Sequence, residues 1–227
     1  MTMTMTTATP TKRTKNPLKG LLLYFLYSAG WRLAIVYLQS IAWGVAFLIF
    51  GNIWLHFIFG VNAIASATLL IVTGMGNKEI VWERFQLTMP VRRSDLATSQ
   101  YLSVGLAPLI GIPIFVLFTW LSSIWHEEIY FTLAATFISI APFLSMPLIF
   151  AALLFPLASI PALENKQEGF VVLFMAASAA IPQLVMGWAY RMGWSLNIAS
   201  FMTLGISLLA FIVSYFITRK MYSKLDF

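Results

Sequence analysis

Long apolar runs fill most of this chain and constrain its fold more than any other feature. Of its 227 residues, 60% are hydrophobic and 10% are charged, against roughly a quarter charged in an ordinary soluble domain. Each run approaches or exceeds the roughly 20 residues with which a helix crosses a bilayer. We therefore expect an all-α integral membrane protein.

The apolar runs predict six transmembrane helices. These are Trp31–Phe50, Ile53–Gly76, Tyr101–Ile124, Ile129–Phe155, Gly169–Tyr190 and Leu196–Thr218. If both termini are cytosolic, only Arg191 of the 14 basic residues falls outside, which is the positive-inside distribution. The inside set is Lys12, Arg13, Lys15, Lys19, Arg32, Lys78, Arg84, Arg92, Arg93, Lys166, Arg219, Lys220 and Lys224. An odd number of spans would scatter this distribution, and the net charge of +6 suits anionic lipid headgroups without any nucleic acid partner.

The start of the chain is polar and rich in threonine. We interpret residues 1–16 as a disordered cytosolic tail and residues 17–227 as a single six-span transmembrane domain. A helix from Leu18 to Phe50 would be about 50 Å long, too long for one span. Gly30 and Arg32 therefore predict a corner between an interfacial elbow helix and the first span. A tilted first span that begins near Leu21 is the alternative.

Prolines interrupt the fourth predicted span. Pro-x-x-Ser-x-Pro occurs twice, at 142–147 and at 156–161. Pro142 and Pro147 lie inside the span, where each removes a backbone hydrogen bond and favours a kink. The kinks either line a substrate path or are ordinary features of a membrane helix.

The sequence contains none of the usual catalytic patterns. It lacks a phosphate-binding loop of the Gly-x-x-x-x-Gly-Lys-Ser/Thr type and has no cysteine. His56 and His126 have no metal-ligand partner at helical spacing, and the adjacent Glu127 and Glu128 are typical of a solvated loop. We expect no enzyme activity, no metal site and no bound cofactor.

The centres of the predicted spans carry no Asp, Glu, Lys, Arg or His, whereas ion-coupled transporters usually need such a group. If this chain moves a substrate, its energy must come from another protein through an aqueous loop. The largest candidate is residues 77–100.

This loop mixes apolar and charged residues. Glu79 and Glu83 are four residues apart, on one face of a short helix, and Trp82 is a candidate interface anchor. Pro90 ends that helix, and Ser94 or Asp95 is placed to cap the next one, which leads into the third span. Composition alone leaves two interpretations open: a cytosolic coupling loop between spans 2 and 3, or a helix lying on lipid.

The segment Trp82–Leu102 resembles the corresponding loop of ABC-2 class ABC-transporter permeases. Small six-span members of that class have a Glu-rich segment, a Leu-Pro-x-x-Arg turn and a short helix that ends in Ser-Lys-Tyr. The matching positions are Glu83, Pro90, Arg93, Ser99 and Tyr101. Met89 stands where Leu is common and Gln100 where Lys is common, so a positive charge at position 100 is not expected here.

The resemblance implies a permease subunit of the cell (plasma) membrane that forms a dimer with a second copy or a sister permease. ATP and Mg²⁺ would be bound by a separate ABC ATPase. The ATPase contacts implied are Glu79, Trp82, Glu83 and Arg84, with Pro90 and Arg93 setting the loop geometry. The expected function is export of a hydrophobic or amphipathic peptide, antibiotic or drug. The alternative is a non-transporting immunity or sensor subunit that binds partner proteins through residues 77–100.

Overall fold

The described part of the chain is built from helices. The computed structural model describes residues 17–66, 68, 93–126, 132–158, 160 and 167–224. Its elements are α1 (Pro17–Phe50), α2 (Ile53–Gly60), the π-helical turn η1 (Val61–Ala65), α5 (Arg93–Trp125), α6 (Leu133–Ala158), α7 (Gln167–Arg191) and α8 (Leu196–Lys224). Five of these helices, α1, α5, α6, α7 and α8, are long and apolar enough to cross a membrane. The expected all-α membrane class is confirmed at this level.

The predicted spans differ from the observed helices mainly at their ends. α5 begins at Arg93, eight residues before the predicted Tyr101, because the polar stretch before the apolar run is part of the same helix. The predicted second span, Ile53–Gly76, is described only in its first part, as the apolar helix Ile53–Ala65 with the adjoining residues 66 and 68. Its remainder lies outside the described residues, so the sixth crossing stays a prediction.

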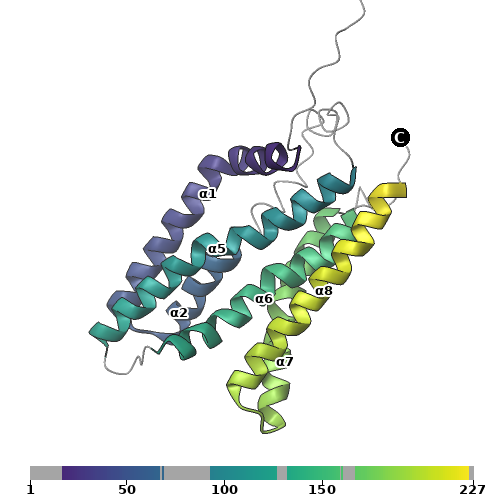
Figure 1. Ribbon diagram of the computed structural model, residues 1–227. Helices are drawn as coiled ribbons and strands as arrows, with labels where there is room; N and C mark the ends of the chain where they lie inside the picture. The colour runs from purple at the N-terminus through teal and green to yellow at the C-terminus, as the bar shows by residue number, and fades with distance from the viewer. Residues whose placement is uncertain are drawn as a thin grey trace, which may run out of the picture.

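The helices form an elongated bundle with two ends (Figure 1). At the first end α1, α5 and α7 begin and α6 and α8 finish; at the second end α2, α6 and α8 begin. α6 packs most extensively against α8, and α5 contacts α1, η1, α6 and α8. Buried small residues occur on both members of the α6–α8 pair, including Ser145, Ala151, Thr203 and Ser207, as is typical of close helix packing in membranes.

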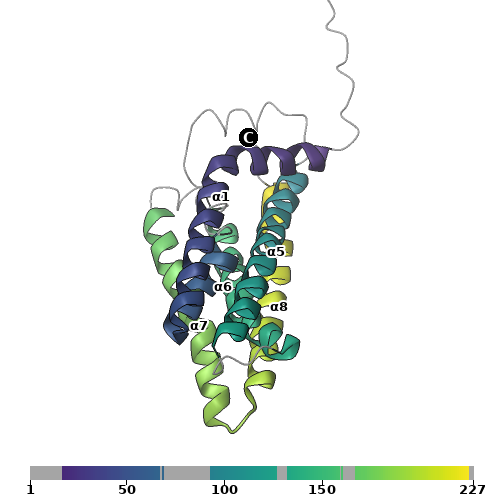
Figure 2. The same ribbon diagram turned by 90° about the vertical axis from the view of Figure 1, so that its left-hand side faces the viewer.

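α1 is one helix that changes direction. Its first part lies across the first end of the bundle, and its remainder runs along α5 (Figures 1 and 2). Gly30 and Arg32, the predicted corner, lie within the continuous helix rather than between two helices. Both are exposed, and the Arg32 guanidinium carbon lies 5.8 Å from the ring centroid of Trp31. An elbow on the membrane surface stays a prediction.

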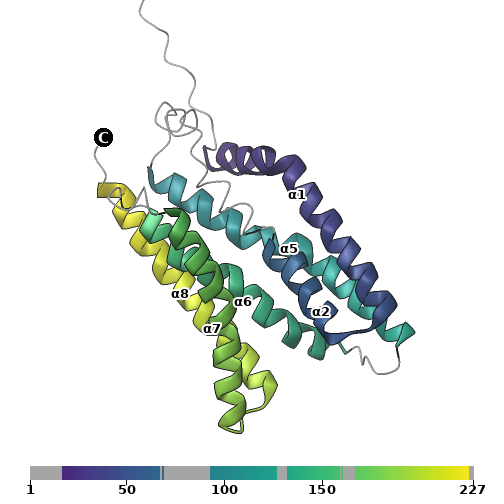
Figure 3. The ribbon, with the colours of Figure 1, turned by 180° about the vertical axis from the view of Figure 1, so that it is seen from behind.

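Two separate hydrophobic clusters hold the helices together. The first-end cluster consists of Tyr101, Val104, Phe150, Ala151, Leu154, Phe155 and Phe174. The second-end cluster consists of Phe47, Phe59, Ala63, Ile64, Phe115, Ile140 and Phe143. α5 and α6 contribute to both, while the first-end cluster takes its other member from α7 and the second-end cluster takes the rest from α1, α2 and η1. Figure 3 shows α2 in front of α5 and away from α7, and α2 packs against α1.

Both prolines of α5, Pro108 and Pro113, and one of the three prolines of α6, Pro147, lie between these clusters. Along α5, Pro108 lies between Val104, which belongs to the first-end cluster, and Phe115, which belongs to the second-end cluster. Along α6, Pro147 lies between Phe143 of the second-end cluster and Phe150 of the first-end cluster. Each proline removes one backbone hydrogen bond from its helix. The two shared helices are therefore weakened in their hydrogen bonding where they leave one cluster and enter the other.

Glycines allow two close approaches at the second-end cluster. A Cβ at Gly111 of α5 would overlap the backbone carbonyl oxygen of Ala63 in η1. A Cβ at Gly60 of α2 would overlap the ring of Phe143 in α6. Because glycine has no Cβ, α5 can approach η1 this closely at Gly111, and α6 can approach α2 this closely at Gly60.

Candidate coupling site

The predicted site residues are only partly within the described structure. Glu79, Trp82, Glu83, Arg84 and Pro90 lie outside the described residues. Arg93 is the first residue of α5. Pro142 and Pro147 lie inside α6, which remains helical on both sides of them, and Pro147 is fully buried. Their predicted role as kinks of a substrate path is untested.

The first turn of α5 shows how the helix begins. Ser94 and Asp95, which the sequence suggested as caps, already lie inside the helix. The Asp95 carboxylate is in the first turn, where the positive end of the helix dipole favours a negative charge. The Thr98 hydroxyl donates to the carbonyl oxygen of Ser94 at 2.7 Å, one turn earlier in the same helix.

Two turns into α5, Tyr101 joins this helix to α8. The Tyr101 hydroxyl oxygen lies 2.6 Å from Ser214 Oγ and 2.9 Å from Thr218 Oγ1. Ser214 Oγ also donates to the carbonyl oxygen of Ala152 in α6, at 2.8 Å. One tyrosine hydroxyl therefore sits in a hydrogen-bonded group, here called the Tyr101 cluster, that connects α5, α6 and α8.

The number of hydroxyl hydrogens fixes the direction of these bonds. Each hydroxyl has a single hydrogen to donate, and that of Ser214 is used for the Ala152 carbonyl. Tyr101 must then donate to Ser214, and Thr218 must donate to Tyr101. The bonds run in one direction from Thr218 through Tyr101 and Ser214 to the Ala152 carbonyl.

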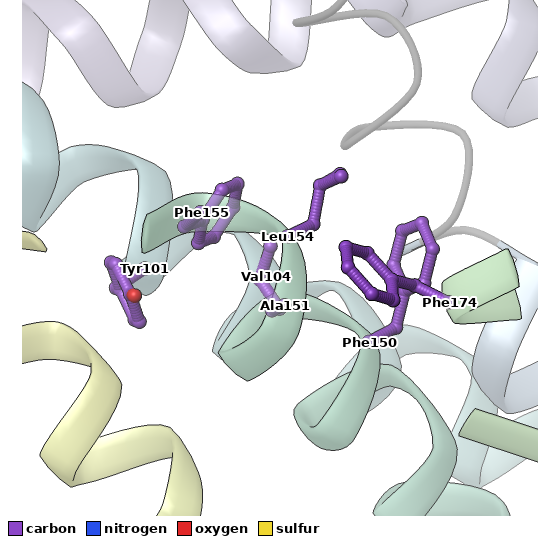
Figure 4. Close-up of a cluster of buried hydrophobic side chains, with 7 residues drawn as sticks. All are labelled: Tyr101, Val104, Phe150, Ala151, Leu154, Phe155 and Phe174. Carbon is purple, nitrogen blue, oxygen red and sulfur yellow. The ribbon is translucent and has the colours of Figure 1, made fainter. Parts of the chain in front are cut away.

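Aromatic rings enclose Tyr101. Its ring centroid lies 4.8 Å from that of Phe155 in α6, 5.0 Å from Phe211 and 5.4 Å from Tyr215 in α8. The Tyr215 hydroxyl is 3.1 Å from Thr98 Oγ1 and forms a second contact between α5 and α8. Tyr101 is 4% exposed and Thr218 is fully buried, so water does not compete for these bonds. Figure 4 shows Tyr101 at one side of the first-end cluster, with Phe150 and Phe174 at the other.

The sequence offered little that would reveal this cluster. Ser214 and Thr218 are four residues apart and share one face of their helix, but serine and threonine are common throughout the chain. Tyr101 belongs to the loop motif, which does not indicate its partners. Its partners lie 113 and 117 residues away along the chain.

The second end of the bundle holds both histidines. His56 packs among phenylalanine rings, with centroid distances of 5.0 Å to Phe47, 5.0 Å to Phe115 and 6.4 Å to Phe143. His126 Nε2 is 2.9 Å from the carbonyl oxygen of Leu48. Within the described residues no group of three His, Cys, Asp or Glu side chains is placed to hold a metal ion.

Comparison with known proteins identifies the family. The family model described as ABC-2 family transporter protein matches residues 21–223, which include every described helix apart from the first residues of α1 and the last residue of α8. A search of curated proteins and a search of solved structures each found no match. The family indicated by residues 82–102 is thus confirmed over almost the whole length of the protein. The chain belongs to the ABC-2 family of transporter proteins, as a permease of that class.

Proposed function

We propose that this chain is the transmembrane permease subunit of an ATP-driven ABC exporter. Its substrate is a hydrophobic or amphipathic peptide, antibiotic or drug, and ATP and Mg²⁺ are bound by a separate ABC ATPase subunit. The observation that carries this proposal is the family match over residues 21–223 on a bundle with five long apolar helices. The permease works in the plasma membrane as a dimer with a second copy or a sister permease.

The distribution of charge supports an orientation with the first end in the cytosol. Among the described helices, Lys19 and Arg93 lie near the first end, together with Arg219 and Lys220 of α8, whereas Arg191 lies at the second end. Basic residues favour the cytosolic side of a membrane protein. On this topology the chain has six spans with both termini cytosolic, and the first part of α1 is an elbow helix on the inner membrane surface.

The position of α5 supports energy transfer through residues 77–100. The proposed ATPase contacts are Glu79, Trp82, Glu83 and Arg84, followed by Pro90 and Arg93 at the turn. α5 begins at Arg93 and continues to Trp125, a length of about 50 Å at 1.5 Å per residue. Movement of the loop then enters the membrane through one continuous helix. Pro142 and Pro147 of α6 are the proposed flexible points of the substrate path.

Co-expression with candidate ABC ATPase subunits tests the proposal. We expect the ATPase to copurify with the chain and to drive efflux of hydrophobic dyes and labelled amphipathic peptides. A hydrolysis-deficient ATPase supports no efflux. Glu83→Arg and Pro90→Gly lower efflux at least tenfold, because one reverses a proposed contact charge and the other releases the turn.

Arg191→Glu is the matched control, because it changes the charge at the second end and leaves residues 77–100 intact. Efflux by this variant equals that of the unmodified chain. Two results would refute the proposal: an ATPase that does not copurify, or equal efflux with the intact and the hydrolysis-deficient ATPase. The second result would favour the non-transporting immunity or sensor role.

A further inference from the structure

We propose that the Tyr101 hydroxyl is the positioning group that makes the first ends of α5 and α8 move as one unit during the ATP cycle. This inference rests on the proposed function, since it concerns how movement of α5 spreads through the permease. It assigns a role to α8, which neither the family match nor the sequence pattern assigns.

The contacts at Tyr101 differ from simple packing because they are directional and shared among three helices. Its hydroxyl accepts a hydrogen bond from Thr218 and donates one to Ser214, and both partners belong to α8. Ser214 then passes the connection to the Ala152 carbonyl of α6. A displacement of α5 relative to α8 breaks at least two hydrogen bonds in a site that water does not reach.

A second contact between the same helices reinforces this connection. Thr98 lies one turn before Tyr101, and its hydroxyl is 3.1 Å from that of Tyr215, one residue after Ser214. Both polar contacts lie in the first half of α5. In the second half of α5, Phe115 belongs instead to the second-end cluster, which includes no residue of α8. The connection to α8 is therefore concentrated near the end of α5 that the proposed loop would move.

The remaining partners of Tyr101 are rings, and they allow the hydroxyl to be tested separately. Phenylalanine at position 101 retains the contacts with Phe155, Phe211 and Tyr215 and removes only the hydroxyl. Ser214 keeps its bond to the Ala152 carbonyl in that variant. The ring packing is thus kept while the directional link between α5 and α8 is lost.

Tyr37 provides a matched control on the other side of α5. Its hydroxyl donates to the carbonyl oxygen of Ala107 at 3.1 Å and so joins α1 to α5 without involving α8. Tyr37→Phe removes one tyrosine hydroxyl that bonds to the same helix. A difference between the two variants reports the link to α8 rather than the general loss of a hydroxyl in the bundle.

The experiment measures the distance between α5 and α8 in the complex with the ATPase. Spin labels are attached to cysteines introduced at Leu102 and Lys220, which are exposed; the chain has no cysteine of its own. Distance distributions are recorded by pulsed electron resonance without nucleotide and with ATP and Mg²⁺ on a hydrolysis-deficient ATPase. In the unmodified chain and in Tyr37→Phe we expect the distance between the two labels of one copy to give a narrow peak that does not change with nucleotide.

In Tyr101→Phe we expect the distribution to broaden and to shift when ATP is added, and efflux per ATP hydrolysed to fall about tenfold. Thr218→Val, which removes one donor to Tyr101 and keeps the shape of the side chain, produces the same change in weaker form. It also replaces Tyr101→Phe as the test if that variant does not fold. Distributions in these variants that match those of the unmodified chain and of Tyr37→Phe would overturn the inference.

These outcomes separate the inference from the proposed function. An ATPase that fails to copurify with the unmodified chain contradicts the proposed function itself. An ATPase that copurifies and drives efflux, combined with no effect of Tyr101→Phe on distance or on efflux per ATP, contradicts only the role of the hydroxyl.

Discussion

Gly111 and Gly105 lie six residues apart on α5 and predict opposite responses to the same substitution. An added Cβ at Gly111 would overlap the Ala63 carbonyl oxygen, whereas nothing lies within 4 Å of the corresponding position at Gly105. The neighbour at Gly111 is backbone, so it cannot turn away as a flexible side chain does. Gly111→Ala must push α5 away from η1.

The expected magnitudes follow from these surroundings. Overpacking of a well-packed site costs about 1–3 kcal/mol, and Gly111→Ala belongs at the upper part of that range. Gly105→Ala in a helix interior is neutral or stabilising by about 0.5–1 kcal/mol. At roughly 2–4 °C per kcal/mol for a chain of this size, the Tm of Gly111→Ala falls by about 6 °C and that of Gly105→Ala stays level or rises by about 2 °C.

Thermal unfolding of the detergent-solubilised protein, followed by the loss of the monodisperse peak in size-exclusion chromatography, measures both variants. Gly111→Ser, which adds a slightly larger side chain, should lower the Tm at least as much as Gly111→Ala. Equal Tm values for Gly111→Ala and Gly105→Ala would refute the reasoning, because they would mean that α5 and η1 are not held in contact at this point.

Two further pairs of variants test the second end of the bundle. Phe143→Ala should destabilise the protein by about 3–5 kcal/mol, because this side chain is 5% exposed and belongs to the second-end cluster. Phe137 on the same helix is 58% exposed, so Phe137→Ala should change the Tm little. Similar losses of stability for both variants would contradict the assigned core. Gly51 and Gly193 both have positive φ, 61° and 75°, so alanine is strained at either, but only at Gly51 would the added carbon also meet the ring of His126, at 3.0 Å. Thermal unfolding should therefore show a larger loss for Gly51→Ala than for Gly193→Ala, and the reverse order would show that His126 does not pack there.

The helical class could be predicted from the sequence because it depends on local composition. A run of about 20 apolar residues must be helical to cross a bilayer, whatever its neighbours are. Helix ends were less accessible from hydropathy, which starts the third span only at Tyr101. The capping residues Ser94 and Asp95 came closer, because α5 begins at Arg93. Hydropathy reports where lipid begins and not where the helix begins. The contacts proposed at Glu79 and Glu83 lie outside the described residues.

The pairing of helices could not be predicted, because it depends on contacts between residues far apart in the chain. Tyr101 and Thr218 are 117 residues apart, and Gly111 meets a carbonyl group 48 residues before it in the chain. A hydropathy profile does not distinguish one long apolar helix from another, so it does not predict which helices pack together. The loop motif identified the family and Tyr101 as one of its positions, but the role of α8 required the three-dimensional arrangement.

If the proposed loop moves α5, Pro108 is a point about which this helix could tilt. Pro108 lies 15 residues after Arg93, about 22 Å along the helix axis at 1.5 Å per residue. A tilt of about 10° at this fulcrum carries Arg93 through about 4 Å, and Tyr101, about 10 Å from the fulcrum, through less than half of that. The arm beyond Pro108 is anchored by Phe115 in the second-end cluster. Such a tilt would move Arg93 most and Tyr101, which joins α5 to α8, less than half as far.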